Sequence, residues 1–195
     1  MANKMTSRGK QALATKKRIY NSGIRLIKQH GYENITVAQI AKKADVSIGT
    51  FYHHFQSKFD LLAEIYRIGD VFFKERVPEL LLQYESCIER VVEYFCLYAL
   101  LSIQNGIEMV RNLYLPTNEM FLSHGRAMQN LLTDILHLGQ EQGELTDSLS
   151  PEIIMEKLFV VARGVIFDWC LHNGKSDLVT DMRDIIRGQT LSYLS

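Results

Sequence analysis

The sequence predicts an all-α protein of about nine helices, in which a three-helix N-terminal domain precedes a larger helical domain. Apolar residues recur at helical spacing along most of the chain, and no alternating strand pattern is present. Side chains that cap helix ends stand in front of several of these segments. The chain has 195 residues, of which 47% are hydrophobic, and this is enough to bury a substantial core.

The first helix is predicted from about Lys16 to His30, where Gly31 supplies a C-terminal cap. Apolar residues from Ile19 to Ile27 lie on one side of this helix, which should support the elements that follow. Residues 1–15 are polar and basic with few apolar anchors. We therefore expect them to form a mobile N-terminal arm.

Two short helices and a tight turn are predicted next. Thr36 and Gln39 form a capping box, in which each side chain satisfies a free backbone donor at the helix start. The apolar pattern is interrupted at residues 44–46, and Ser47 can cap a second helix that buries Phe51. This arrangement suits a DNA-binding helix-turn-helix, whose second helix lies in the major groove.

The rest of the chain is helical by the same pattern. Pro78 predicts a break or kink, and Ser150 followed by Pro151 is typical of a helix start. Helices are expected over residues 57–77, 84–104, 106–115, 118–142, 151–173 and 177–194.

The net charge of zero hides a division between the two ends of the chain. Residues 1–58 carry 11 basic and two acidic side chains, a net charge of +9, and the remainder carries −9. A basic segment around a helix-turn-helix indicates binding to a polyanion, whereas the acidic remainder would avoid one.

The residues from Thr36 to Leu62 resemble the signature of the tetracycline-repressor (TetR) family of bacterial transcription regulators. They read T-V-A-x-I-A-x-x-A-x-V-S-x-G-T-F-Y-x-H-F-x-x-K-x-x-L-L. With the preceding helix, the resemblance covers roughly the first third of the chain. The turn position that the family usually fills with Gly is Asp45 here. Asp tolerates a left-handed backbone better than most residues, so we expect the turn to be retained.

The resemblance implies a DNA-binding domain over residues 16–62 and a ligand-binding and dimerisation domain over residues 63–195. The implied function is that of a ligand-responsive regulator, most simply a repressor, which binds a palindromic operator as a dimer and is released by a small molecule. Carried over position by position, the family pattern assigns Gly49, Thr50 and His53 to base edges, and Thr36, Ser47, Tyr52, His54 and Lys58 to phosphates. Thr36 and Ser47 would cap their helices even without DNA.

Aromatic and methionine side chains of the second domain are typical of an apolar ligand pocket, which would accept an apolar or aromatic effector. Arg163 lies alone in an apolar run and could bind a negative group of that effector. For any single one of these residues, ordinary core packing is the competing interpretation. The candidate ligand-binding residues are Tyr94, Tyr98, Met109, Phe121, Met128, Phe159, Arg163 and Phe167.

The last two helices are expected to form the interface of a homodimer, because their apolar surfaces are too extensive to leave exposed. Two-fold symmetry would place two recognition helices about 34 Å apart, or a small multiple of that, to bind a palindrome. The candidate interface residues are Ile154, Leu158, Val161, Val165, Trp169, Met182, Ile185 and Ile186.

Two other classes of protein compete with this interpretation. One is a TetR-like activator, or a partner-binding module without small-molecule induction. The other is a helical-bundle metalloenzyme, which would need paired Glu-x-x-His motifs. Asp134-x-x-His137 stands alone, and the three cysteines lack CxxC spacing. We therefore expect no catalytic residues, metal or cofactor. We also expect a cytoplasmic protein, since no apolar run approaches the roughly 20 residues that span a membrane.

Overall fold

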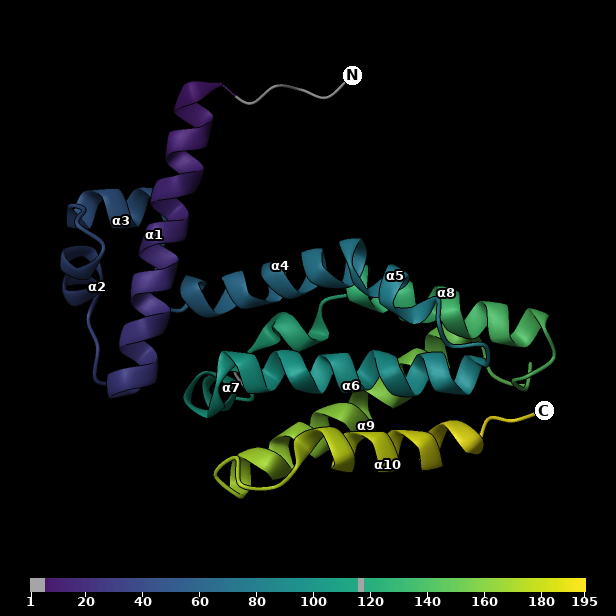
Figure 1. The fold of residues 1–195 in the computed structure, drawn as a ribbon. Helices are drawn as coiled ribbons and strands as arrows, with labels where there is room; N and C mark the ends of the chain where they lie inside the picture. The colour runs from purple at the N-terminus through teal and green to yellow at the C-terminus, as the bar shows by residue number, and fades with distance from the viewer. Residues whose placement is uncertain (1–5, 116–117) are drawn as a thin grey trace. The chain divides into compact units, whose positions relative to one another are not determined.

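The computed structural model describes residues 6–115 and 118–195, which form two compact units divided between Tyr66 and Arg67. The described residues contain ten α-helices, one 3-10 helix and one isolated β-bridge, between Leu145 and Leu194 (Figure 1). The predicted all-α class is confirmed. The helices are α1 (Ser7–His30), α2 (Val37–Lys43), α3 (Ile48–His54), α4 (Asp60–Glu75), α5 (Val77–Leu81), α6 (Cys87–Asn105), α7 (Ile107–Leu113), η1 (Glu119–Leu122), α8 (Ala127–Glu141), α9 (Pro151–Leu171) and α10 (Leu178–Leu191).

Helix α1 begins at Ser7, so the predicted start at Lys16 is wrong. The Thr6 hydroxyl accepts a hydrogen bond from the Gly9 N–H at 3.3 Å and caps the helix. The intervening residues are mostly good helix formers, which need no apolar anchor to continue a helix already started. Residues 6–15 of the predicted arm are therefore capped or helical, and residues 1–5 lie outside the described residues.

The helix pair α2–α3 has the predicted local structure. Thr36 and Gln39 form both hydrogen bonds of the capping box, and the Ser47 hydroxyl accepts from the Thr50 N–H at 3.0 Å. Asp45 has a φ of +52°, the left-handed conformation that the family resemblance predicts for the turn. The turn is thus retained with a non-glycine residue.

Replacing Asp45 by Gly is expected to stabilise the N-terminal unit by about 0.5 kcal/mol, because glycine adopts a positive φ without the strain of a Cβ atom. Asp45→Asn is the matched control, since it removes the charge and keeps the tolerance for this conformation. Urea unfolding of the three proteins tests the point. Equal stability of the Gly and Asn variants would show that conformation is not the cause.

The core of the N-terminal unit joins α1, the helix pair and the start of α4. Gly23 on α1 allows a close approach, because a Cβ there would lie 2.6 Å from the Leu61 Cδ1 atom. Beside this core, Lys16 forms an ion pair with the buried Glu64 at 2.8 Å. The main buried side chains are Ile19, Ile27, Ile35, Ile40, Phe51, Phe55, Leu61, Leu62 and Ile65.

Helix α6 is the centre of the C-terminal unit. It packs against α5, α7, α8, α9 and α10, and Figure 1 shows it running between α4 and α10. The chain breaks between α4 and α5, where Pro78 occupies the first turn of the new helix as predicted. Helix α4 crosses the division between the units, so it links the helix-turn-helix covalently to the second core.

The single helix predicted over residues 118–142 is wrong. The structure has the short η1 and then α8, which starts at Ala127. Gly125 between them has a φ of +72°, which no α-helix accommodates. The break creates an irregular segment that lies against α8 and α9 and forms part of a cavity described below.

All three cysteines are buried and free. Burial raises the pKa of the Cys87 thiol to about 12 and those of Cys96 and Cys170 to about 11. Because the thiolate is the reactive form, we expect the folded protein to react very slowly with a thiol reagent at pH 8. The same reagent should titrate three thiols after unfolding in urea. Rapid labelling of the folded protein would contradict the described burial.

Candidate DNA-binding surface and effector cavity

Helix α3 presents an open surface at the predicted base-contacting positions. Gly49 and His53 are exposed, and Tyr52 keeps about half of its side chain accessible, at 53%. Thr50 is half-buried, and its hydroxyl lies 2.9 Å from that of Ser47. Around Gly49 there is free space, since a Cβ there would meet only the Ser47 oxygen, at 3.7 Å.

Thr36 and Ser47 have the capping role that the sequence indicated. The Thr36 hydroxyl accepts from the Gln39 N–H at 3.3 Å and lies 3.2 Å from the Gln39 Oε1 atom. Both residues are exposed, so a phosphate could still reach the starts of the two helices. Their local function is to satisfy free backbone N–H groups at the starts of α2 and α3.

His54 differs from its neighbour His53. It is half-buried, and burial, together with the charges of His53 and Lys16, lowers its pKa from the usual 6.5. The ring is therefore neutral at physiological pH and can contact a phosphate only as a hydrogen-bond donor. The two rings lie 5.1 Å apart, at an angle of 75°.

Lys58, which the family pattern assigns to phosphates, is bonded within the N-terminal unit. Its Nζ atom donates to the carbonyl oxygens of Tyr32 at 2.7 Å and Ile35 at 3.1 Å. The ammonium also lies 4.1 Å from the centre of the Tyr32 ring. Two of its three N–H donors are thus occupied, and they tie the loop after α1 to the segment before α4.

Exposed basic side chains on α1 and α2 were not named individually from the sequence, because the family pattern assigns only motif positions. The charge count already pointed to them. They include Lys17, Arg18, Arg25, Lys42 and Lys43.

The C-terminal unit contains a cavity of about 250 Å³ between the η1 segment and α9. Of the predicted ligand-binding residues, Phe121, Phe159 and Arg163 line it. The Arg163 guanidinium lies 5.7 Å from the centre of the Phe121 ring. The remaining lining residues are Leu122, His124, Gln129, Met155, Glu156 and Val160.

Tyr98 adjoins this cavity, because its ring lies 6.0 Å from that of Phe159 and its hydroxyl 3.2 Å from the Tyr114 hydroxyl. Burial raises the pKa of Tyr98, while the bond to Tyr114 and the charges of Arg126 and Arg163 oppose that rise.

The other predicted ligand-binding residues are elsewhere. Tyr94 and Met128 lie in the core, where the Tyr94 hydroxyl donates to the Met128 carbonyl at 2.7 Å. Met109 is buried on α7, outside the cavity lining, and Phe167 is half exposed on α9. The missed residue Met155 could have been found, because residues 155, 159 and 163 follow the i, i+4 spacing of one helix face.

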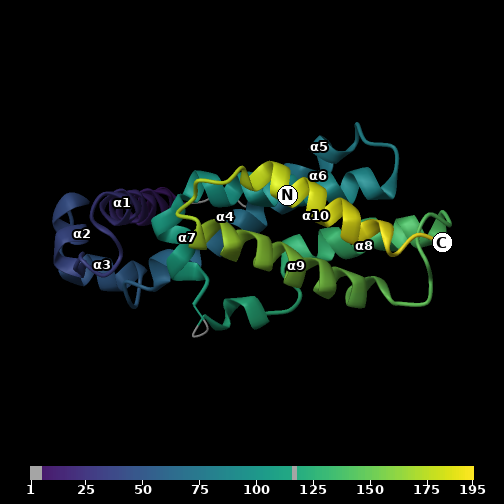
Figure 2. The same ribbon diagram turned by 90° about the horizontal axis from the view of Figure 1, so that it is seen from below.

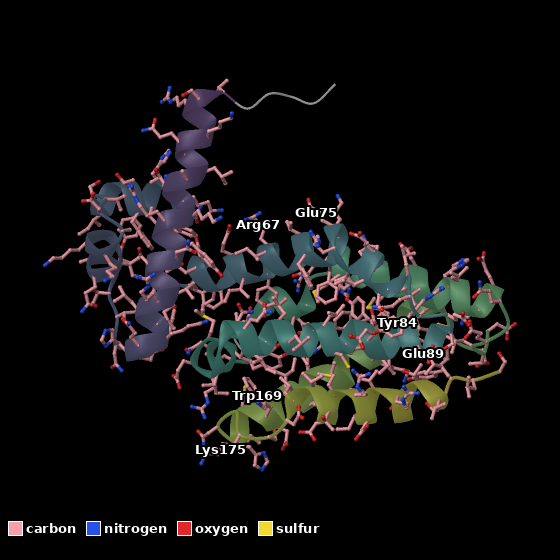
Figure 3. All side chains as sticks on the ribbon, in the orientation of Figure 1. Arg67, Glu75, Tyr84, Glu89, Trp169 and Lys175 are labelled. Carbon is pink, nitrogen blue, oxygen red and sulfur yellow. The ribbon has the colours of Figure 1, made fainter. Side chains whose placement is uncertain are left out.

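Most of the predicted dimer-interface residues are buried in their own chain. This assignment is therefore wrong for Ile154, Leu158, Val165, Trp169, Met182 and Ile186. Val161 packs against the same core, and only Ile185 is exposed. Figure 3 labels Trp169 near the end of α9, before the turn that carries Lys175. These residues belong to the core that α9 and α10 form with α6 and α8, so they are unavailable to a partner.

The opposite side of α9 and α10 forms an open apolar face, which we call the outer face. On α9, Ile153, Val160, Phe167 and Leu171 are exposed on one side of the helix. Ile185 and Leu191 add exposed apolar surface on α10. Figure 2 shows the two helices side by side, and a groove of about 530 Å³ between them includes Ile153 and Val160.

No helix in the described ranges is both long enough and apolar enough to cross a membrane. The same part of the chain holds no group of three or more His, Cys, Asp or Glu side chains placed to bind a metal ion.

A capped helix-turn-helix in a basic unit, joined to an acidic helical unit with a cavity, defines a helix-turn-helix transcription regulator. Comparison with known proteins specifies the family. Residues 19–65 match the model described as bacterial regulatory proteins, tetR family. The chain belongs to the TetR family of bacterial transcription regulators.

One relative and two solved structures extend the similarity beyond the helix-turn-helix. The fatty acid metabolism regulator protein of Bacillus subtilis is 25% identical over 167 residues, which cover 83% of this chain and 86% of that protein. The crystal structure of FadR from Bacillus subtilis with stearoyl-CoA has a TM-score of 0.73 at 22% identity, covering 89% of this chain and 97% of that one. Thermus thermophilus FadR with lauroyl-CoA has a TM-score of 0.71 at 23% identity, covering 89% and 92%.

Proposed function

We propose that this protein is a transcriptional repressor that binds a palindromic operator as a homodimer and leaves it when a small-molecule effector binds. The observation that carries the proposal is the capped α2–α3 pair, whose second helix presents Gly49, Tyr52 and His53 to the outside. The basic charge of residues 1–58 supplies the sequence-independent part of the affinity. Such a regulator acts where the chromosome lies, so the location we propose is cytoplasmic.

The outer face of α9 and α10 is the surface that we propose for dimerisation. Its exposed apolar side chains would be covered by the same face of a second chain, as two-fold symmetry requires. Gly164 on α9 and Gly188 on α10 are exposed in mid-helix, and a Cβ at either would meet no other atom within 4 Å. Glycine inside a helix costs about 1 kcal/mol of stability relative to alanine. Close approach of a partner helix would account for the presence of glycine at both positions.

The effector that we propose is a long-chain fatty acyl-CoA. Two structures with the same fold are named as complexes with stearoyl-CoA and lauroyl-CoA, and the matched relative is a fatty acid metabolism regulator. The cavity supports this class, because Phe121, Met155 and Phe159 offer an apolar wall and Arg163 a positive charge. Its volume of about 250 Å³ holds only part of such a molecule, so binding requires the η1 segment to move.

A Gly49→Leu variant tests the DNA-binding surface. The side chain has room in the free protein, so the fold should be unchanged, and helix propensity should rise. Operator affinity should fall more than about 10-fold, because the new side chain would fill the space between α3 and the base edges. Fluorescence anisotropy with DNA from upstream of the protein's own gene measures this. Gln29→Leu, an exposed position on α1, is the control.

Release by effector is the second part of the test. Lauroyl-CoA should dissociate the wild-type protein from this DNA, and CoA alone should not. Affinity for the DNA should also fall steeply with salt. A protein that binds the fragment with no salt dependence, or that stays bound at saturating lauroyl-CoA, would contradict the proposal.

A further inference from the structure

The cavity of the C-terminal unit contains a positive charge without a counter-charge. Among the described residues, Arg163 forms no hydrogen bond or ion pair, and its contact is the face of the Phe121 ring. The side chain is half-buried, so water compensates its charge only in part. Glu156 also lines the cavity, but it is exposed and two helical turns away on α9.

A second arginine lies at the end of the irregular segment that forms one wall of this cavity. The Arg126 Nε atom donates to Asp70 on α4 at 3.0 Å, and the Met128 N–H donates to the same carboxylate at 3.4 Å. Both side chains of the ion pair are mostly buried, with 13% and 24% of their surfaces exposed. Asp70 thus fixes α4 to the start of α8 through two contacts.

The cavity and this ion pair belong to one connected group. The Arg126 N–H donates to Gln129 Oε1 at 3.0 Å, and Gln129 lines the cavity and donates to the Ser123 carbonyl at 2.9 Å. The charges of Arg126 and Arg163 also both oppose the rise in the pKa of Tyr98 that burial causes. A ligand that moves residues 121–129 therefore moves Arg126 as well, since capping bonds join them.

We propose that the anionic group of the effector binds to Arg163 and competes with Asp70 for Arg126, so that effector binding opens the Asp70–Arg126 ion pair. The inference rests on the proposed function and specifies its ligand site. The apolar chain of the effector enters between Phe121 and Phe159. The anionic group is a carboxylate or a phosphate, which are the two groups that an arginine binds in bidentate geometry.

Opening this ion pair has a direct consequence for DNA binding. Helix α4 continues from the DNA-binding unit, and Asp70 is its anchor on α8. Without the anchor, α4 is free to shift, and the spacing of the two recognition helices in a dimer changes. By linkage, the effector and the operator weaken each other's binding by the same factor, and a change that weakens the ion pair should favour the effector and disfavour the operator.

Binding assays with four probes test the first step. Lauroyl-CoA and laurate each combine the apolar chain with an anionic group. CoA has the anionic groups without the chain, and dodecanol has the chain without a charge. Arg163→Met should weaken binding of the anionic amphiphile that the wild type binds, lauroyl-CoA or laurate, about 10- to 100-fold. It should leave the affinity for dodecanol unchanged. Arg163→Lys should recover part of the loss. Arg187→Met, an exposed arginine on α10, is the control.

The probes also separate the two sources of the anion. Tight binding of laurate assigns Arg163 to the carboxylate end, whereas tight binding of lauroyl-CoA with weak binding of laurate assigns it to a phosphate. Equal affinity of the Arg163→Met and wild-type proteins for every probe would overturn the proposal. So would a wild-type protein that binds no anionic probe, even if it binds its operator normally.

Asp70→Asn tests the second step, because it keeps the shape of the side chain and removes the charge. This variant should bind lauroyl-CoA more tightly and the operator more weakly than wild type, each by about 5- to 50-fold. Glu93→Gln is the matched control, since Glu93 forms an ion pair with Arg183 in the same unit at 3.3 Å. If Asp70→Asn behaves like Glu93→Gln, the ion pair is not the switch. Failure of wild-type DNA binding would instead refute the proposed function, and the probe assays would still test Arg163.

Discussion

Phe167→Glu is expected to convert the dimer into a folded monomer and to weaken operator binding at least about 100-fold. The side chain is half exposed on the outer face of α9, so a charge there costs the single chain little. In the dimer the same charge would be buried against apolar helices without a partner, which is strongly unfavourable. The loss of affinity follows because a monomer occupies one half-site and forfeits the gain from binding two at once.

Sedimentation measures the change of mass, circular dichroism checks the fold, and anisotropy gives the operator affinity. Leu82→Glu is the control, because Leu82 is 80% exposed and lies between α5 and α6, away from the outer face. The variant also decides the assignment of Phe167. A Phe167→Glu protein that stays dimeric and loses lauroyl-CoA binding would return this residue to the effector pocket.

The sequence predicted the helix-turn-helix well because its signals act over short distances. A capping box joins residues three apart, and both Thr36 and Ser47 act as caps in the structure. The left-handed turn at Asp45 is equally local. In such cases the free energy that fixes the structure is contained within a few neighbouring residues, so the sequence alone reveals it.

The orientation of α9 was predicted wrongly because this helix is apolar on most of its circumference. Leu158 and Phe167 are both apolar, but Leu158 is buried in its own chain and Phe167 is half exposed. Periodicity identifies a helix and gives no preference between two apolar faces. The positions of α6 and α8 decide which face is internal, and those positions depend on contacts between distant residues.

The effector cavity was predicted in part for a related reason. Phe159 and Arg163 were found because they lie in one short run, and Phe121 because it is aromatic. Gln129 lines the cavity beyond the break at Gly125, where a continuous helix was expected. Side chains on the two sides of such a break do not follow one continuous helical spacing, so the apolar pattern could not place Gln129 at the cavity.

Lys58→Met is expected to destabilise the N-terminal unit by about 2–3 kcal/mol, because it removes two hydrogen bonds that a charged group makes to carbonyl oxygens. The oxygens belong to Tyr32 and Ile35, which precede Lys58 by 26 and 23 residues. The ammonium is half-buried rather than fully enclosed, which keeps the cost near the lower end of that range. Unfolding in urea, with hydrogen exchange of the α1–α3 amides, locates the loss.

The salt dependence of operator binding separates this structural role from a phosphate contact. If Lys58 contacted a phosphate, its removal would flatten the slope of log affinity against log salt by about one unit. We expect the slope of the Lys58→Met protein to be unchanged under conditions where it is fully folded. Lys43→Met, an exposed lysine on α2, serves as the comparison, since its loss leaves the fold intact. A stable Lys58→Met protein with a flatter slope would restore the assignment made from the family pattern.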